Sequence, residues 1–382
     1  MDNSPSQDLH IGIDASRSVG NRPTGTELYS RYLIEALLER APDRFSFCLY
    51  FNRSPRSPIA QQRSEIRIMP FPRLWTHFRL SLEMLRQPPD LLFVPAHVLP
   101  IVHPRRSVVT VHDLGYWYFP EAHLRFQRWY LDRTTRWHTR TAAHLLADSE
   151  ATKRDLIDRY HTRPDRISVA YPGLDPTVHR IEDQNEIARV KAKYHIDGDY
   201  LLYLGTLQPR KNLSRLITAF HQANIASQSP IANIQLLIAG KIGWQADPLF
   251  KQVAELGLSA RVRFPGYVDA LDKSALLTGA QAFVFPSLYE GFGFPILEAM
   301  ACGTPVLCSN TSSLPEVAGA AAVMINPLDV ASIAKGLIHI LDDRSLCGNL
   351  IDRGYAQVRK FTWSACADVA LTVFEQVLSA SH

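Results

Sequence analysis

The chain has 382 residues, 46% of them apolar, so it is too long for one ordinary hydrophobic core and we expect two domains. Its formal charge is +4, but residues 1–180 carry 25 Lys and Arg against 19 Asp and Glu, whereas the remainder carries 16 against 18. Because no recognised binding motif accompanies the excess of positive charge, we do not expect nucleic acid as a partner.

The apolar runs are shorter than the roughly 18 to 20 residues of a transmembrane helix, and the start of the chain lacks the pattern of a secretory signal. Five scattered cysteines fit reduced thiols better than a disulfide framework, and none has the spacing of metal ligands. We therefore expect a cytoplasmic protein.

Short β-branched runs alternate with helix-period segments in both halves of the chain, which predicts two parallel sheets with crossover helices. In the first half we expect strands at residues 9–14, 107–113 and 142–149, and a helix over residues 26–40. The second strand ends at His112 and Asp113, although a lone histidine at a strand end usually has a structural role.

Residues 53–86 are rich in arginine, interleaved with Phe71, Trp75 and Phe78. This mixture suits an anionic membrane surface. A solvated face with snorkelling arginines explains the stretch equally well.

In the second half we expect strands at residues 200–205, 234–240, 262–266, 282–287 and 304–309, after a polar boundary segment between residues 176 and 200. The D-x-D pattern of Asp197 and Asp199 is interpreted as a turn, because it precedes a strand and ligand-binding loops follow strand ends. The carboxyl ends of two such sheets would hold a ligand between the domains.

Two acids flank the turn "GFGFP" in residues 286–306, "PSLYEGFGFPILEAMACGTPV". We expect Glu290 in the loop and Glu298 in a helix that begins near Pro295, where free N–H groups and a glycine turn favour an anion or sugar hydroxyls. Structural roles are an alternative: Glu290 as a solvated acid and Glu298 as a partner of the helix dipole.

A second candidate is "YLGTLQPRKN", where Arg210 and Lys211 follow a strand that ends at Gly205. Cations beside a glycine turn can neutralise a diphosphate through charge-assisted hydrogen bonds. Without further context they would be interpreted as solvated loop residues.

The stretch around Glu290 and Glu298 resembles the E-x7-E signature of the family-4 retaining glycosyltransferases, and the resemblance is strongest between residues 200 and 329. It implies the GT-B fold, an α/β architecture of two Rossmann-like domains facing across a cleft. It also implies an N-terminal acceptor-binding domain at residues 1–180, a nucleotide-sugar-binding domain at 181–360, and a C-terminal helix at 361–382 that packs back on the first domain. No metal or other cofactor is required in that family.

The resemblance places Lys211 on the donor phosphates, with Arg210 in support because Thr206 stands where many members carry an arginine. It assigns Glu290 to the sugar, Glu298 to the ribose and His112 to orienting sugar and acceptor. The expected catalytic residues are His112, Glu290, Lys211 and Arg210, and the expected donor-binding residues are Gly25, Gly205, Thr206, Arg210, Lys211, Tyr267, Val268, Glu290, Gly291, Phe292, Gly293 and Glu298.

The implied reaction is metal-independent hexosyl transfer with retention, from GDP-mannose or a UDP-sugar such as UDP-glucose. The acceptor would be a saccharide, linked to polyprenyl diphosphate, in bacterial polysaccharide assembly at the inner face of the membrane. Two alternatives stay open: a nucleotide-sugar epimerase or phosphorylase of the same fold, and a catalytically silent sugar-nucleotide-binding protein.

Overall fold

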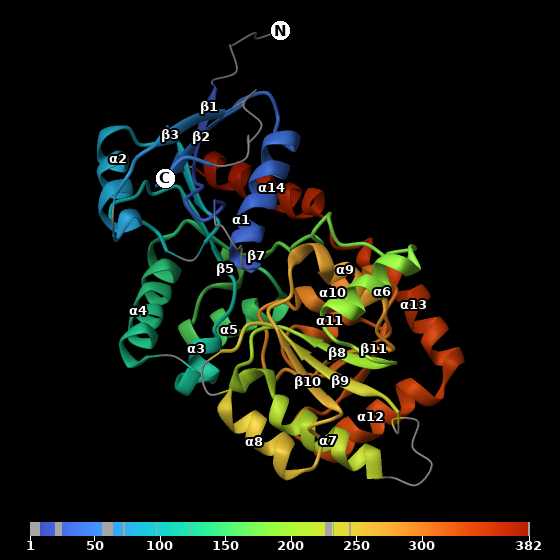
Figure 1. The fold of residues 1–382 in the computed structure, drawn as a ribbon. Coiled ribbons are helices and arrows are strands. Elements are labelled where there is room, and N and C mark those ends of the chain that lie inside the picture. Colours follow the sequence, from blue (N-terminus) through green and yellow to red (C-terminus); the bar gives the residue numbers. More distant parts are fainter. Residues whose placement is uncertain are drawn as a thin grey trace. The chain divides into compact units, whose positions relative to one another are not determined.

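The structure is a computed structural model that describes residues 8–19, 25–55, 64–71, 73–96, 98–122, 124–225, 231, 233–243 and 246–380. It divides into two units (Figure 1). Unit 1 comprises Met1–Trp117, Arg125–Gly173 and Phe361–His382, and unit 2 comprises Tyr118–Leu124 and Leu174–Lys360. Each is described by itself.

Unit 1 contains a seven-stranded sheet in the order β3-β2-β1-β4-β5-β6-β7, with all neighbouring strands parallel. Chain order reverses beside β1, as in doubly wound α/β folds. The strands are β1 Leu9–Asp14, β2 Phe45–Phe51, β3 Ser64–Ile68, β4 Leu91–Val94, β5 Ser107–Val111, β6 His144–Ala147 and β7 Ile167–Val169.

Helices cover both faces of this sheet, which explains why successive residues of one strand belong to different cores. Phe93 packs in the core that includes α1 and α14, whereas Val94 packs in the core that includes α2 and α5. The helical segments of unit 1 are α1 Gly25–Arg40, the π-helical η2 Thr76–Leu80, α2 Ser81–Arg86, α3 Gly115–Tyr118, α4 Arg125–Thr141, α5 Glu150–Tyr160, η4 Pro164–Arg166 and α14 Trp363–Ser379. The last residue of α3, Tyr118, and the short η3 Pro120–Ala122 group with unit 2.

The C-terminal helix α14 belongs to unit 1, where it packs on α1. The Thr362 side chain caps its first turn by accepting a hydrogen bond from the Ala365 N–H. Its buried residues Cys366, Ala370 and Phe374 recur every four positions and form an apolar stripe.

Unit 2 repeats the doubly wound plan with a six-stranded parallel sheet in the order β10-β9-β8-β11-β12-β13. The strands are β8 Tyr200–Leu204, β9 Gln235–Ala239, β10 Val262–Gly266, β11 Ala282–Phe285, β12 Val306–Ser309 and β13 Ala322–Ile325. The helical segments are α6 Gln184–Lys193, η5 Pro209–Lys211, α7 Leu213–Ile225, α8 Asp247–Glu255, α9 Ala270–Thr278, α10 Phe294–Ala301, α11 Leu314–Ala318, α12 Val330–Asp342 and α13 Arg344–Val358.

The predicted fold class, two Rossmann-like α/β domains, is confirmed. In unit 2, β8 pairs directly with β11, so the loops that follow these two strands leave the same edge of the sheet. The first loop carries Arg210 and Lys211 and the second carries Glu290. No helix in the described part of the chain is long and apolar enough to cross a membrane.

Candidate active site

The loop after β8 presents two cations at the end of a short 3-10 turn, η5. Asn212, with a left-handed backbone at φ 61°, ends that turn. Its side-chain amide donates to the carbonyls of Pro286 and Pro327, at 3.1 and 2.7 Å, and thereby ties η5 to the loops after β11 and β13. The backbone carbonyl of Arg210 also accepts a hydrogen bond from the Leu288 N–H at 2.8 Å. The two loops therefore form one connected structure.

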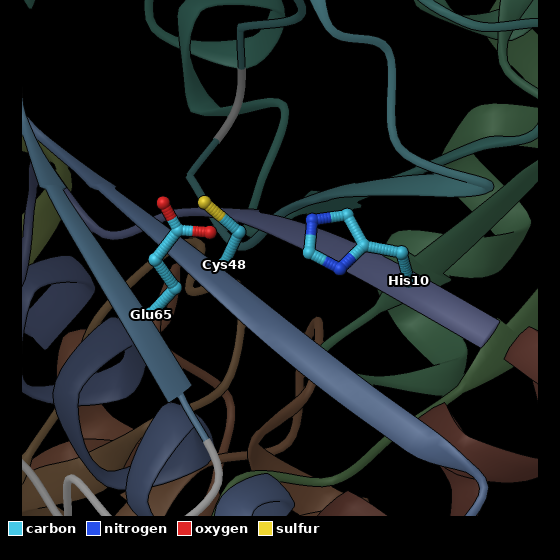
Figure 2. Close-up of side chains that lie close together, drawn as sticks. All are labelled: His10, Cys48 and Glu65. Atoms are coloured by element: carbon cyan, nitrogen blue, oxygen red, sulfur yellow. The ribbon is translucent and has the colours of Figure 1, made fainter. Parts of the chain in front are cut away.

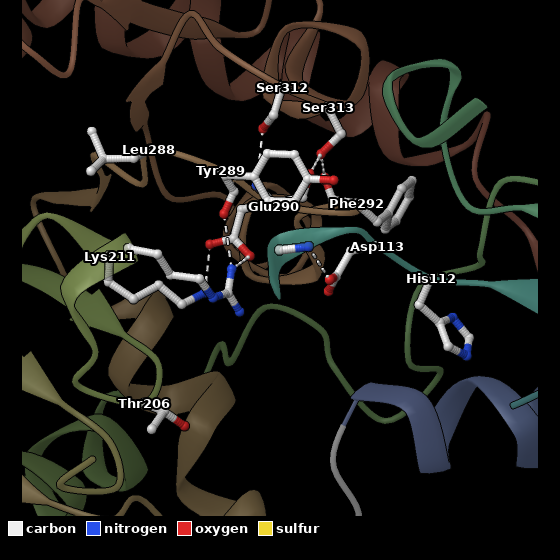
Figure 3. A network of polar contacts seen from close by, with 12 residues as sticks. His112, Asp113, Thr206, Lys211, Leu288, Tyr289, Glu290, Phe292, Ser312 and Ser313 are labelled. Atoms are coloured by element: carbon white, nitrogen blue, oxygen red, sulfur yellow. Dashed lines mark hydrogen bonds and ion pairs between the residues drawn. The ribbon is translucent and has the colours of Figure 1, made fainter. Parts of the chain in front are cut away.

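Glu290 lies on the loop between β11 and α10. The segment that leads into α11 holds this loop in place through hydrogen bonds. The Glu290 N–H donates to Ser312 Oγ at 3.0 Å, and Ser313 Oγ lies 3.0 Å from the Glu290 carbonyl and 2.7 Å from the Phe292 carbonyl (Figure 3). Gly293 has φ 115°, and a Cβ there would lie 2.8 Å from Leu314. The turn before α10 therefore requires glycine at this position.

Glu290 accepts hydrogen bonds from both cations. Arg210 Nη1 lies 2.7 Å from Glu290 Oε2 and 2.9 Å from the Tyr289 carbonyl, while Lys211 Nζ donates to Glu290 Oε1 (Figure 3). Burial opposes ionisation of Glu290, but the charges of Arg210 and Lys211 outweigh it and lower the pKa of this carboxyl to about 2. The carboxylate is therefore charged at neutral pH.

This arrangement has a chemical consequence. One carboxylate balances only one of two cations, so the group of Arg210, Lys211 and Glu290 keeps one net positive charge at the loop before α10. An incoming diphosphate would compete with Glu290 for the same N–H donors. A carboxylate displaced in this way would then be available to hydrogen-bond sugar hydroxyls.

Glu298 is buried on α10 but has a protein partner. Lys273 Nζ on α9 donates to Glu298 Oε1 at 2.6 Å and also lies 4.0 Å from Asp175 Oδ2. Lys273 therefore already compensates the charge of Glu298, and the expected contact of Glu298 with the ribose stays a prediction.

The other expected donor residues of unit 2 line neighbouring strand ends. The Gly205 N–H donates to the Ala239 carbonyl, and a Cβ on Gly240 would lie 2.1 Å from the Gly205 carbonyl oxygen, so the ends of β8 and β9 pack closely. Thr206 lies outside the hydrogen-bonded group around Glu290 (Figure 3).

The two residues expected at the nucleotide base differ in exposure. Val268 is buried, whereas Tyr267 is 51% exposed. Beside the Glu290 loop, Phe292 is buried, and its ring packs edge-on against Phe294 at 5.1 Å. Gly291 shares that loop with Phe292.

Two expected site residues belong to unit 1. Gly25 is the first residue of α1, and its neighbour Thr24 lies outside the described residues. His112 follows β5 and engages both ring nitrogens: Nδ1 lies 2.7 Å from Asp148 Oδ2, and Nε2 lies 3.0 Å from the Pro95 carbonyl.

Because a carbonyl cannot donate, Nε2 carries a proton, and the His112–Asp148 pair shares another. Burial alone would lower the pKa of His112, but the Asp148 carboxylate outweighs it and raises that pKa. In this arrangement neither ring nitrogen is available to a ligand.

Four functional candidates escaped sequence reasoning: Lys273, Asp148, Ser312 and Tyr118. Tyr118 groups with unit 2, and its ring stacks on Tyr289 at 4.7 Å, next to Glu290. Short sequence patterns do not identify these residues, because each lies far along the sequence from the residue that it contacts. Asp148 lies near the end of the strand predicted at residues 142–149, and in the structure it directly follows β6.

Among the described residues, one group brings three metal-ligand atoms within 4.8 Å of one another: His10, Cys48 and Glu65, from strands β1, β2 and β3 (Figure 2). Arg67 donates two hydrogen bonds to Glu65, and burial raises the pKa of the Cys48 thiol to about 11. A guanidinium beside the acid and a protonated thiol both oppose cation binding, so we assign no metal to this group.

Two family matches together span most of the chain. Residues 23–178 match "Glycosyltransferase Family 4", and residues 184–357 match "Glycosyl transferases group 1".

Among curated proteins, O-antigen chain mannosyltransferase B of Escherichia coli is 33% identical over 278 residues, which cover 71% of this chain and 70% of that protein. The serotype-specific mannosyltransferase WbdA of Escherichia coli is 31% identical over 73% of this chain, but the matched part spans only 34% of its length.

Solved structures share the whole architecture at low identity. Sucrose-phosphate synthase from Thermosynechococcus elongatus has a TM-score of 0.74 at 20% identity, covering 98% of this chain and 100% of that one. Anabaena HepE in complex with UDP-glucose has a TM-score of 0.69 at 19% identity, covering 97% and 98%.

Proposed function

Because this chain belongs to the glycosyltransferases that combine a Family 4 segment with a group 1 segment, we propose that it transfers mannose from GDP-mannose to a hydroxyl group of a saccharide acceptor. The observation that carries the proposal is the pair of cations, Arg210 and Lys211, that converge on Glu290. Mannose is favoured over other hexoses because the two curated relatives described above are mannosyltransferases.

The cations act on the leaving group. Arg210 and Lys211 would bind the donor diphosphate and stabilise the negative charge that develops on it as the sugar departs. This electrostatic role needs no metal ion, and each charge-assisted hydrogen bond contributes about 1.5 to 3 kcal/mol.

Glu290 would exchange its cation partners for hydroxyl groups of the sugar once the diphosphate arrives. Glu298, held by Lys273, would accept from the ribose, and the departing phosphate would take the proton of the acceptor. Retention of anomeric configuration is proposed from the E-x7-E signature alone. His112 would act indirectly, by fixing the loop after β5 through Asp148 and Pro95.

The acceptor is proposed to be a saccharide linked to polyprenyl diphosphate at the inner face of the membrane. The support is that one relative is an O-antigen chain mannosyltransferase. UDP-glucose is the alternative donor, because the solved structure of Anabaena HepE holds that nucleotide sugar.

The test is a transfer assay with GDP-mannose and UDP-glucose in parallel, using lipid-linked and soluble saccharide acceptors. We expect release of GDP that depends on the acceptor, with the anomeric configuration of the product read by NMR. Turnover of the donor without acceptor would indicate an epimerase, and turnover with inorganic phosphate would indicate a phosphorylase. Donor binding without any product in either arm would indicate a silent binding protein.

A further inference from the structure

The helix of η2 and α2 turns an apolar stripe toward solvent. Phe78, Leu82 and Leu85 follow one another at positions i, i+4 and i+7 and are all exposed, with Leu85 exposed by 65%. The opposite side of the same helix is buried, at Leu80 and Met84, against the core of unit 1. A helix that is already packed on one side and still apolar on the other is unusual for a surface in water.

Helix α4 of the same unit also exposes apolar side chains. Its first turn exposes Phe126 by 74% and Trp129 by 57%, and the two rings stack at 5.9 Å. A hydrogen bond of 2.6 Å between His77 Nε2 and the Tyr130 hydroxyl joins η2 to α4.

In the described part of unit 1, every exposed large apolar side chain lies between Ile68 and Trp129. We call the surface formed by Phe78, Leu82, Leu85, Phe126 and Trp129 the α2–α4 face.

The segments that form the α2–α4 face are rich in arginine. Residues 73–86 and 125–140 contain eight arginines against two acidic residues, a formal charge of +6. Both acids already have partners. Glu83 is buried and paired with Arg67 and Arg79. Asp132 accepts a hydrogen bond from the Tyr160 hydroxyl and lies 3.7 Å from Arg136. The positive charge is therefore not neutralised within this surface.

We propose that the α2–α4 face binds an anionic phospholipid bilayer, with its apolar side chains inserted at the level of the headgroups and its arginines on the lipid phosphates. A positively charged amphipathic surface with Leu, Phe and Trp on its apolar side has the composition of in-plane membrane helices. Tryptophan and arginine both place a polar end at the interface and an apolar body below it.

The charge of the α2–α4 face favours an anionic bilayer over a second copy of the chain as its partner. A symmetric dimer through the α2–α4 face would bring two surfaces of charge +6 together, and like charges across an interface cost several kcal/mol. A bilayer that contains anionic lipid supplies the opposite charge over an extended plane.

The structure corrects one detail of the arginine-rich stretch and shows which arginines suit a test. Trp75 is buried, with its indole N–H donating to the Met69 carbonyl at 2.7 Å, so it does not reach a membrane. Arg79 is paired with buried Glu83 at 2.9 Å and is a poor probe, because its loss would leave that acid short of a partner. Arg86 and Arg128 are exposed and serve instead.

The inference deepens the proposed function, since a lipid-linked acceptor lies in a membrane, but its test contains no sugar. The full chain is sedimented with vesicles of phosphatidylcholine alone and with vesicles that contain phosphatidylglycerol. We expect binding to the anionic vesicles that falls with added salt. Leu82→Ser with Leu85→Ser should weaken it by about tenfold or more. Arg86→Gln and Arg128→Gln should each weaken it by about fivefold.

The matched controls are Leu271→Ser, which changes an apolar residue exposed by 90% on α9 of unit 2, and Arg359→Gln, which changes an exposed arginine of unit 2. Both should bind vesicles as the parent does. Equal binding by all variants would overturn the proposal, and so would a dimer that the Leu82 and Leu85 substitutions abolish or binding that requires an acidic protein. A chain that binds vesicles but transfers no sugar would contradict the proposed function alone.

Discussion

Lys211 donates a hydrogen bond to Glu290 although 79 positions separate them in the sequence, and both side chains are buried. Burying two charges is costly in itself, so the pair is stable only while each compensates the other. Arg210 adds a second, partly exposed cation to the same carboxylate. In the proposed mechanism the donor diphosphate takes the place of Glu290 beside these two cations.

Glu290→Gln should separate binding from transfer. Without the carboxylate, Arg210 and Lys211 lose their competitor, so GDP should bind about threefold to tenfold more tightly, while mannose transfer falls by at least about a hundredfold. Calorimetry with GDP and the transfer assay measure the two effects. Glu255→Gln, a change at an exposed acid of unit 2, should alter neither. Weaker GDP binding by Glu290→Gln would show that Glu290 contributes to nucleotide binding and does not compete with it.

Unit 2 should lose stability in acid because of Glu290. Its pKa is about 2 in the folded chain, below the ordinary value of 4.5, so the unfolded chain binds more protons between these values. The stabilisation is complete above about pH 5 and is lost as the pH falls toward 2, and it amounts to about 3 kcal/mol. Hydrogen exchange of β11 and α10 amides at pH 7, 5 and 3 measures it. A difference between parent and Glu290→Gln that stays constant with pH would contradict this.

Asp148 should stabilise unit 1 through His112. Asp148→Ala leaves the buried Nδ1 of His112 without its partner and should cost about 2 to 4 kcal/mol. Asp148→Asn should cost only about 1 kcal/mol, because an amide can donate to Nδ1 of a neutral imidazole whose Nε2 still donates to Pro95. Hydrogen exchange in β5 and β6 reports both values, with Asp165→Ala as an exposed control. Equal losses in the two variants would count against a specific role for this hydrogen bond.

Transfer should persist when metal ions are removed. In the proposed mechanism Arg210 and Lys211 supply the cations that face the donor phosphates, so EDTA should change the rate by less than about twofold. A rate that collapses in EDTA and recovers with manganese would point instead to Asp197 and Asp199. These residues flank Gly198, whose φ is 78°, in an exposed turn before β8.

Short sequence patterns predicted the bounds of several strands and helices well. Apolar runs located β1 and β10 at their observed bounds, and the glycine turn with Pro295 located the start of α10. Strand ends also directed attention to Lys211 and Glu290. These predictions succeed because each depends on backbone preferences and burial within a few residues.

Pairings between distant segments could not be predicted. Glu290 meets Arg210 only because β8 pairs with β11, and Glu298 meets Lys273 only because α9 lies beside α10. The exposed stripe on α2 depends on which side of a helix faces the core. Because the helix is apolar on both sides, its packing in the rest of the fold decides which side is buried.

The proposed function depends most on one expected contact, that between Lys211 and the donor diphosphate. Calorimetric titration of GDP-mannose into the parent, Lys211→Met and Lys251→Met tests it directly, because Lys251 is an exposed lysine of the same unit. We predict that Lys211→Met weakens binding by about tenfold to a hundredfold, as expected for one charge-assisted hydrogen bond, and that Lys251→Met changes it by less than about twofold. Equal affinities for GDP-mannose in all three proteins would contradict the assignment of the donor site.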